Sequence, residues 1–195
     1  MSTAIKVMII EDDPFWQARL SEDLCLEEDI EVLGVAANGK EAHSQLAGKQ
    51  ADVILVDINL TENHLDGLDV ARELSRMTTH SRKPQIIMLT SIDDEDVIVR
   101  SFQSGAINFL SKSSYSDILQ AIRDAYTGKF SIHSDAASTI VREMQLTVLS
   151  QSEKEVYKLK NKGLSKTQIS EKLHKSVNTI KTQLKNIKKK LTDER

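Results

Sequence analysis

The chain has 195 residues, of which 39% are hydrophobic and 28% charged, a composition typical of an ordinary soluble protein with one large or two small domains. Its apolar runs are too short to cross a membrane, and we expect no export signal at its start. A single cysteine excludes an internal disulfide and fits a reducing cytoplasm.

Charge is unevenly distributed behind the formal net value of -3. Residues 147–195 contain 13 Lys or Arg and 5 Asp or Glu, a net charge of +8. Residues 1–146 therefore contain 13 Lys or Arg and 24 Asp or Glu, a net charge of -11. This asymmetry predicts two domains with different partners, and the basic one is the candidate for binding nucleic acid.

The first part of the chain is predicted to alternate strands and helices. Five apolar segments have the length and continuity of strands buried on both faces, and a helical pattern follows each. The first two helices have start signals, Pro14 and the capping residue Asn38. We therefore predict an α/β domain with a five-stranded parallel, doubly wound sheet, with strands at Ile5–Ile10, Val32–Ala36, Val53–Val56, Ile86–Leu89 and Ile107–Leu110.

Polar residues follow four of these strands. Glu11 and Asp12 follow the first, Asp57 the third, Thr90 the fourth and Lys112 the fifth. The carboxyl ends of parallel strands share one rim, where such sheets bind ligands. Three carboxylates repel one another, which a hard cation such as Mg²⁺ relieves. With a hydroxyl and an ammonium nearby, the set predicts phosphoryl transfer to Asp57; acidic residues scattered over separate loops are the alternative.

The motifs "IIEDDP", "VDINL", "MLTS" and "NFLSK" resemble those of the receiver domain of two-component response regulators, over about residues 4–128. The resemblance implies a flavodoxin-like fold and a phosphoryl group passed from a histidine kinase to Asp57. It also implies a bound Mg²⁺ held by Glu11, Asp12, Asp57 and the backbone carbonyl of Asn59. Asp13 is then a neighbouring acid rather than a ligand.

The same resemblance implies roles for three residues on the later strands. Thr90 would move toward the phosphoryl group, Lys112 would pair with it, and Phe109 would turn with Thr90, unless Phe109 is a plain core aromatic. One stretch departs from the family. Thr61 stands where a proline is usual, and the glycine of "TENHLDG" comes about two residues late, so the loop after Asp57 is longer.

Residues 129–146 are predicted to be a linker with a short helix from Ser134 to Met144. Capping-box spacing at Ser150 and Ser165 then marks two helix starts, and a third, basic helix begins at Ser176. Short helices joined by a tight turn, with a basic helix last, predict a small all-α helix-turn-helix domain at residues 147–195.

The last helix has an apolar stripe of Ile180, Leu184, Ile187 and Leu191 and a basic face opposite it. A solvated Lys-rich helix is the alternative to a DNA-reading one. The segment 147–191 resembles the helix-turn-helix domain of the NarL/FixJ/LuxR type, but most of the usual last helix is missing. The residues predicted to contact double-stranded DNA are Lys175, Asn178, Lys181, Thr182, Lys185, Lys188 and Lys189.

These observations lead to one functional prediction, a cytoplasmic response regulator in which phosphorylation of Asp57 controls DNA binding and transcription. It would catalyse only its own phosphoryl transfer and dephosphorylation, and it would contact no membrane. A homodimer, if formed, would use the receiver or the linker helix near Ile140–Met144. The alternatives are a Mg²⁺-dependent phosphatase with an aspartyl nucleophile, disfavoured by "IIEDDP" and the basic tail, and a phosphorylation-independent adaptor whose tail contacts protein.

Overall fold

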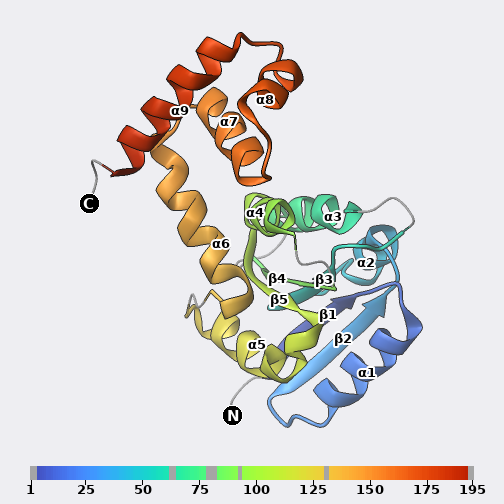
Figure 1. Cartoon of the computed structure of the whole chain (residues 1–195). Helices are drawn as coiled ribbons and strands as arrows, with labels where there is room; N and C mark the ends of the chain where they lie inside the picture. Colours follow the sequence, from blue (N-terminus) through green and yellow to red (C-terminus); the bar gives the residue numbers. More distant parts are fainter. Residues whose placement is uncertain (1–3, 62–64, 78–82, 92–93, 130–131, 193–195) are drawn as a thin grey trace. The chain divides into compact units, whose positions relative to one another are not determined.

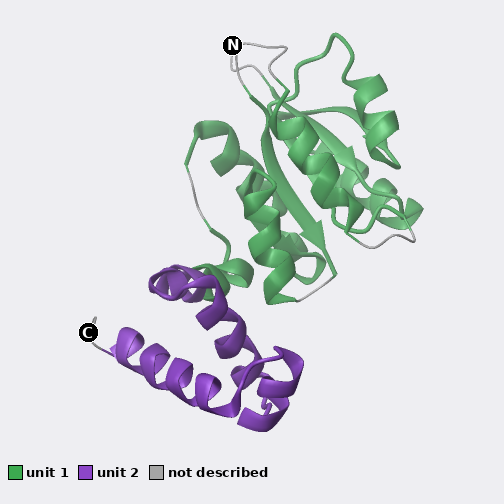
Figure 2. Cartoon of the chain, turned by 90° about the horizontal axis from the view of Figure 1, so that it is seen from above, with its two compact units in different colours: residues 1–140 green, residues 141–195 purple. Residues whose placement is uncertain are grey.

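The computed structural model describes residues 4–61, 65–77, 83–91, 94–129 and 132–192. The chain divides into two compact units, residues 1–140 and residues 141–195 (Figure 2). No helix within the described residues is long and apolar enough to span a bilayer. Each unit is described by itself below.

Unit 1 contains one parallel sheet of five strands in the order β2-β1-β3-β4-β5 (Figure 1). Every residue of β3 is buried, as expected for a strand covered on both faces. The predicted parallel, doubly wound sheet is confirmed, with β2 beginning two residues earlier than expected. The strands are β1 Ile5–Ile10, β2 Ile30–Ala36, β3 Val53–Asp57, β4 Gln85–Thr90 and β5 Ala106–Ser111.

Helices cover both faces of this sheet. Buried side chains of α1 and α5 form one hydrophobic cluster with the sheet, and those of α2, α3 and α4 form the other (Figure 1). The predicted start signals are used: Pro14 opens α1, and the Asn38 side chain accepts a hydrogen bond from Glu41 N–H at 3.0 Å. The helices are α1 Pro14–Cys25, α2 Gly39–Gln45, α3 Asp66–Ser75, α4 Glu95–Gln103 and α5 Ile118–Thr127, with a 3₁₀ segment η1 Lys112–Asp117 before α5.

The start of α3 packs directly on the backbone that follows β3. Gly67 N–H donates to the Ile58 carbonyl at 2.9 Å, and a Cβ at Gly67 would lie only 1.9 Å from the Asp57 carbonyl oxygen. Only glycine fits this approach without moving the chain. The glycine that comes late in the sequence thus still reaches the Asp57 backbone; residues 62–64 of the longer loop lie outside the described residues.

The helix α6, Ser134–Gln145, begins in unit 1, and its residues 141–145 belong to unit 2. Ala136 and Thr139 are buried, and Ile140 packs against the hydrophobic cluster formed by α2, α3 and α4. The predicted short helix is therefore present, but its first half is part of the packed fold of unit 1 rather than an exposed connector.

Unit 2 also contains η2 Leu146–Val148, α7 Gln151–Asn161, α8 Lys166–Lys172 and α9 Val177–Thr192. Both predicted capping boxes form, at Ser150 and at Ser165. Gly163 and His174 adopt left-handed backbone conformations, with φ of 86° and 51°, in the two turns between helices. The buried side chains of these helices form a separate core, made of Leu146, Leu149, Val156, Ile169, Ile180 and Ile187.

One ion pair joins the first and last helices of this core. Lys190 Nζ lies 2.7 Å from Glu153 Oε2, and Glu153 is also the second member of the capping box with Ser150. The hydrogen bond from Lys190 holds the pKa of Glu153 below its ordinary value of 4.5. Because a lowered carboxyl pKa stabilises the folded state above the unfolded pKa, this contribution is present at neutral pH and is lost in acid.

Candidate functional site

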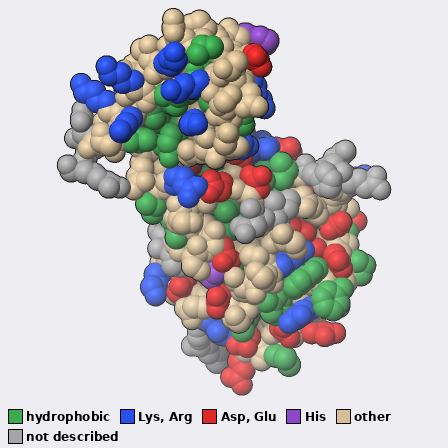
Figure 3. Space-filling view, in the orientation of Figure 1, with side chains coloured by type: hydrophobic (Ala, Val, Ile, Leu, Met, Phe, Trp, Pro, Cys, Tyr) green, Lys and Arg blue, Asp and Glu red, His purple; other side chains and the backbone are tan. Residues whose placement is uncertain are grey.

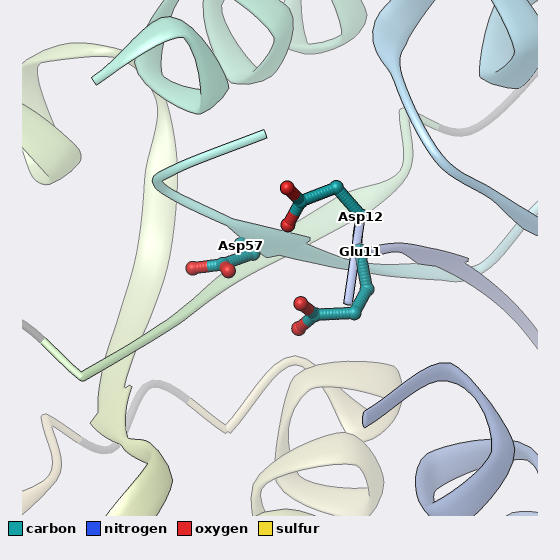
Figure 4. A group of neighbouring side chains, drawn as sticks. All are labelled: Glu11, Asp12 and Asp57. Atoms are coloured by element: carbon teal, nitrogen blue, oxygen red, sulfur yellow. The ribbon is translucent and has the colours of Figure 1, made fainter. Parts of the chain in front are cut away.

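Three carboxylates meet at the carboxyl ends of β1 and β3 (Figure 4). The two strands are parallel neighbours in which Ile10 pairs with Val56, so Glu11, Asp12 and Asp57 come together just beyond that pair. One oxygen of each lies within 4.8 Å of one oxygen of the others. Glu11 and Asp57 are buried, whereas Asp12 is exposed. The acidic cluster predicted from the sequence is thus a single group.

Lys112, the first residue after β5, balances the two buried acids. Its Nζ lies 2.7 Å from Glu11 Oε2 and 2.9 Å from Asp57 Oδ2. Burial disfavours the charge of the lysine, but the two carboxylates outweigh that effect and raise the pKa of Lys112. Burial raises the pKa of Glu11 to about 7, and the charge of Asp57 acts in the same direction while Lys112 opposes it. The rim is therefore short of positive charge.

The acidic cluster has the ligands that a hard divalent cation requires. Magnesium favours a few carboxylate oxygens together with retained water. Glu11 Oε2 is buried with Lys112 Nζ 2.7 Å away, and exposed Asp12 leaves the cluster open to solvent. Asn59, the predicted backbone ligand, is half-buried two residues beyond Asp57, and its side chain accepts a hydrogen bond from Leu65 N–H at 3.4 Å. The residues present fit such an ion.

The backbone fixes the carboxylate of Asp57. Its Oδ1 accepts a hydrogen bond from Ile58 N–H at 2.6 Å, while its Oδ2 accepts one from Lys112 Nζ at 2.9 Å. Asp57 is 6% exposed, so the group is buried at the end of β3. Hydrogen bonds to both oxygens therefore hold the carboxylate in one orientation, which favours its use as a nucleophile.

The two predicted switch residues lie on neighbouring strands. Thr90 is the last residue of β4 and is fully buried; Asp57 pairs with Leu89, so Thr90 lies one position further along the same rim. Phe109 pairs with Met88 in the sheet and is 1% exposed within the core. The structure therefore places Thr90 at the rim and Phe109 behind it, in the position of a core aromatic.

Sequence reasoning missed an aromatic neighbour of Lys112. The ring of Trp16, in the first turn of α1, lies 5.1 Å from Lys112 Nζ, within cation–π range. The helix after the acidic pair begins at Pro14, so its first turn has to lie at the rim. That placement is the signal in the sequence that could have located Trp16.

The other predicted site is on α9. Ile180 and Ile187 are buried and Leu184 and Leu191 pack beside them, so the apolar stripe faces the core of unit 2 as expected. Figure 3 shows several Lys and Arg side chains gathered over α9. The predicted contact residues that are exposed on the opposite face are Asn178, Lys181, Thr182, Lys185, Lys188 and Lys189.

Lys175 differs from the other predicted contact residues. It is half-buried, and its Nζ donates to Ser152 Oγ on α7 at 2.7 Å. Gln183 on α9 donates to the same oxygen at 2.8 Å. Ser152 therefore joins α7 both to the turn before α9 and to α9 itself. No local sequence pattern predicts this contact, because Ser152 and Lys175 are 23 residues apart.

Two family profiles match the chain. The response regulator receiver domain matches residues 7–123, and the luxR family of bacterial regulatory proteins matches residues 147–192. The first match alone covers more than half of the chain.

Two curated relatives match along nearly the whole chain. The transcriptional regulatory protein LiaR of Bacillus subtilis (strain 168) is 30% identical over 196 residues, covering 96% of this chain and 90% of LiaR. The response regulator protein VraR of Staphylococcus epidermidis is 29% identical over 194 residues, with the same coverage.

A solved structure with the same fold is RcsB from Salmonella enterica serovar Typhimurium, bound to promoter P1flhDC in the presence of phosphomimetic BeF₃⁻. Its TM-score is 0.67 at 22% identity, and the match covers 97% of this chain and 92% of that one. At 22% identity, this comparison shows a shared fold and nothing further.

Proposed function

The chain belongs to the response regulators, joining a receiver domain to a regulatory domain of the LuxR family, and from that premise we propose how its two sites act. Proteins of this kind regulate transcription and are not metabolic enzymes. Asp57 accepts a phosphoryl group from a sensor histidine kinase in the cytoplasm, and this modification controls binding to DNA. The receiver comprises residues 1–128, the linker 129–146 and the DNA-binding domain 147–195.

The observation that carries this proposal is the buried Asp57–Lys112 pair beside Glu11 and Asp12. An oxygen of Asp57 attacks the phosphorus atom in line; a P–O bond forms as the P–N bond to the kinase histidine breaks, and the imidazole leaves with the electron pair. Lys112 offsets charge on the transferred oxygens. A magnesium ion held by Glu11, Asp12, Asp57 and the Asn59 carbonyl would supply further neutralisation.

Phosphorylation replaces the single negative charge of the Asp57 carboxylate with a phosphoryl group that carries a charge of roughly -1.5 to -2. The Thr90 hydroxyl and the Lys112 ammonium are the nearby donors on β4 and after β5, so they follow the new oxygens. The space beside Thr90 then changes, and Phe109 is the neighbouring aromatic that adjusts to it. We assign Thr90, Lys112 and Phe109 to this conformational switch, which biases two states of the domain.

The exposed face of α9 supports DNA binding. A helix packed on its own core with a face of Lys, Thr and Asn fits the major groove, where such side chains reach phosphates and base edges. We assign base contacts to Lys181, Thr182, Lys185 and Asn178. Phosphate contacts are assigned to Lys188, Lys189 and Lys175. RcsB, which has the same fold, has been solved on promoter DNA.

Two copies of the chain are expected to act together on DNA. A single recognition helix buries a small interface, and regulators of this size gain affinity by pairing half-sites. Val141 and Met144 of α6 are 54% and 66% exposed, large apolar side chains that a second copy would cover. We therefore propose a homodimer formed through the receiver or α6. A phosphorylation-independent adaptor is disfavoured by the LuxR-family match.

We predict that Mg²⁺ binds the acidic cluster and changes the fluorescence of Trp16, the only tryptophan of the chain, because it lies next to Lys112. Asp12→Asn should weaken binding by about 10- to 100-fold, as loss of a group supporting a metal does. Asp13→Asn is the matched control, because residue 13 caps α1 and asparagine can replace aspartate in that role. Titration of both variants with Mg²⁺ tests this prediction. Equal Mg²⁺ affinities of the two variants would show that Asp12 is not a ligand.

We predict that Thr90→Ala uncouples phosphorylation from DNA binding. The variant should still be phosphorylated at Asp57 but lose most of the gain in affinity, because its rim lacks the hydroxyl. Affinity is measured by fluorescence anisotropy, with and without acetyl phosphate, on a duplex selected from a random library by the phosphorylated wild type. Thr90→Ser keeps the hydroxyl and should respond like the wild type. A full response from Thr90→Ala would refute the switch.

We predict that Lys185 and Lys189 differ in specificity. Lys185→Ala should weaken binding to the selected duplex by about 1–3 kcal/mol and affect random duplex less, because a base contact is lost. Lys189→Ala should weaken both about equally and make binding less sensitive to salt, because a phosphate contact is lost. Anisotropy over a series of salt concentrations measures both effects. Equal losses of specificity in the two variants would show that the base-contacting face of α9 is not the one that contains Lys185.

A further inference from the structure

The start of α6 is bound to the end of β5 by a group of contacts that we call the β5–α6 clamp: Asn108, Ser111, Asp117, His133 and Asp135. Ser111 N–H donates to Asp135 Oδ2 at 2.8 Å, and His133 N–H donates to Asn108 Oδ1 at 3.0 Å. The His133 ring lies between two carboxylates, with Nε2 2.9 Å from Asp117 Oδ2 and Nδ1 3.1 Å from Asp135 Oδ2. These contacts all lie within unit 1.

The clamp is partly shielded from water, since only its Asp117 side chain, 53% exposed, is mostly in solvent. Asn108 is 4% exposed, and its Oδ1 accepts a second hydrogen bond from Phe109 N–H at 2.9 Å. The side chains of His133 and Asp135 are 17% and 22% exposed. The two hydrogen bonds to β5 are partly buried, and breaking them without replacement partners costs free energy, so the clamp favours one position of α6 relative to β5.

The clamp is adjacent in the chain to the residues that phosphorylation affects. Ser111 directly precedes Lys112, whose Nζ is bound to both Glu11 and Asp57. Asn108 directly precedes Phe109. Lys112 begins the 3₁₀ segment that follows β5. A backbone shift of Lys112 toward a phosphoryl group would pass through the shared peptide bond to Ser111 and would lengthen the hydrogen bond from Ser111 N–H to Asp135.

We propose that the β5–α6 clamp couples phosphorylation of Asp57 to the linker helix. The clamp is intact while Lys112 pairs with Glu11 and Asp57; phosphorylation loosens it and frees the first turn of α6, which continues to Gln145 and the DNA-binding domain. Asp135 and His133 are positioning residues in this coupling, since they touch neither the phosphoryl group nor DNA. The inference rests on the proposed function and specifies how it is regulated.

The test uses the full chain and three variants in the first half of α6. Asp135→Ala removes the acceptor for Ser111 N–H, Asp135→Asn keeps an oxygen acceptor there, and Ser138→Ala changes an exposed residue of the same helix as a control. The measurement is the ratio of affinities for the selected duplex with and without acetyl phosphate. Phosphorylation of Asp57 is quantified in the same samples.

We expect a ratio of about fivefold or more for the wild type, the usual lower range of such coupling. Asp135→Ala should be phosphorylated as fully as the wild type, but its ratio should approach one because the unphosphorylated variant already binds DNA tightly. Asp135→Asn and Ser138→Ala should keep the wild-type ratio. A wild-type ratio for phosphorylated Asp135→Ala would overturn the coupling.

Hydrogen exchange of the wild type gives a second test that does not depend on how a variant folds. Amide protection of Ser111 and of the first turn of α6 should fall on phosphorylation. Unchanged protection, together with a normal gain in DNA affinity, would overturn the clamp and leave the proposed function standing. Absence of phosphorylation at Asp57, or of any DNA response in the wild type, would overturn both.

Discussion

The ion pairs of Lys112 with Glu11 and Asp57 are the interaction on which the rest of the site depends. Two buried carboxylates beside a third, exposed one repel each other strongly, and a single ammonium cannot neutralise them all. Burial raises the pKa of Glu11 to about 7, and the charge of Asp57 adds to that effect. Parallel strands impose this arrangement, because they bring the ends of β1, β3 and β5 to one rim. The rim consequently favours the binding of a cation, and it responds to the negative charge that a phosphoryl group adds.

In unit 2, one face of α9 packs on the core, and the opposite face is the one proposed to bind DNA. Ile180 and Ile187 hold α9 to its core, and Lys190 pairs with Glu153 of the first capping box. The lysines on the opposite face make no such contribution and are exposed. A substitution on that face therefore changes DNA binding with little effect on folding, whereas the same change at Lys190 would weaken the link between α7 and α9.

Much of this organisation could be predicted from local patterns. Continuous apolar runs located the five strands, capping residues such as Asn38 and Ser150 located helix starts, and the residues after each strand located the rim. The contacts that escaped prediction join segments far apart in the chain: Ser152 with Lys175, Trp16 with Lys112, and Asp135 with Ser111. Nothing local specifies such pairs, because they depend on how helices settle on the sheet or on each other. For the same reason the sequence predicted a linker at α6, although the first half of this helix is packed in unit 1.

The central claim is that the buried carboxylate of Asp57 is the phosphoryl acceptor. The most direct measurement is mass spectrometry of the intact and digested protein after incubation with acetyl phosphate, with Mg²⁺ or with a chelator. The account predicts one phosphoryl group, on the peptide that contains Asp57, formed only with Mg²⁺ and absent from Asp57→Asn. A phosphoryl group on another residue, or one that persists in Asp57→Asn, would contradict it.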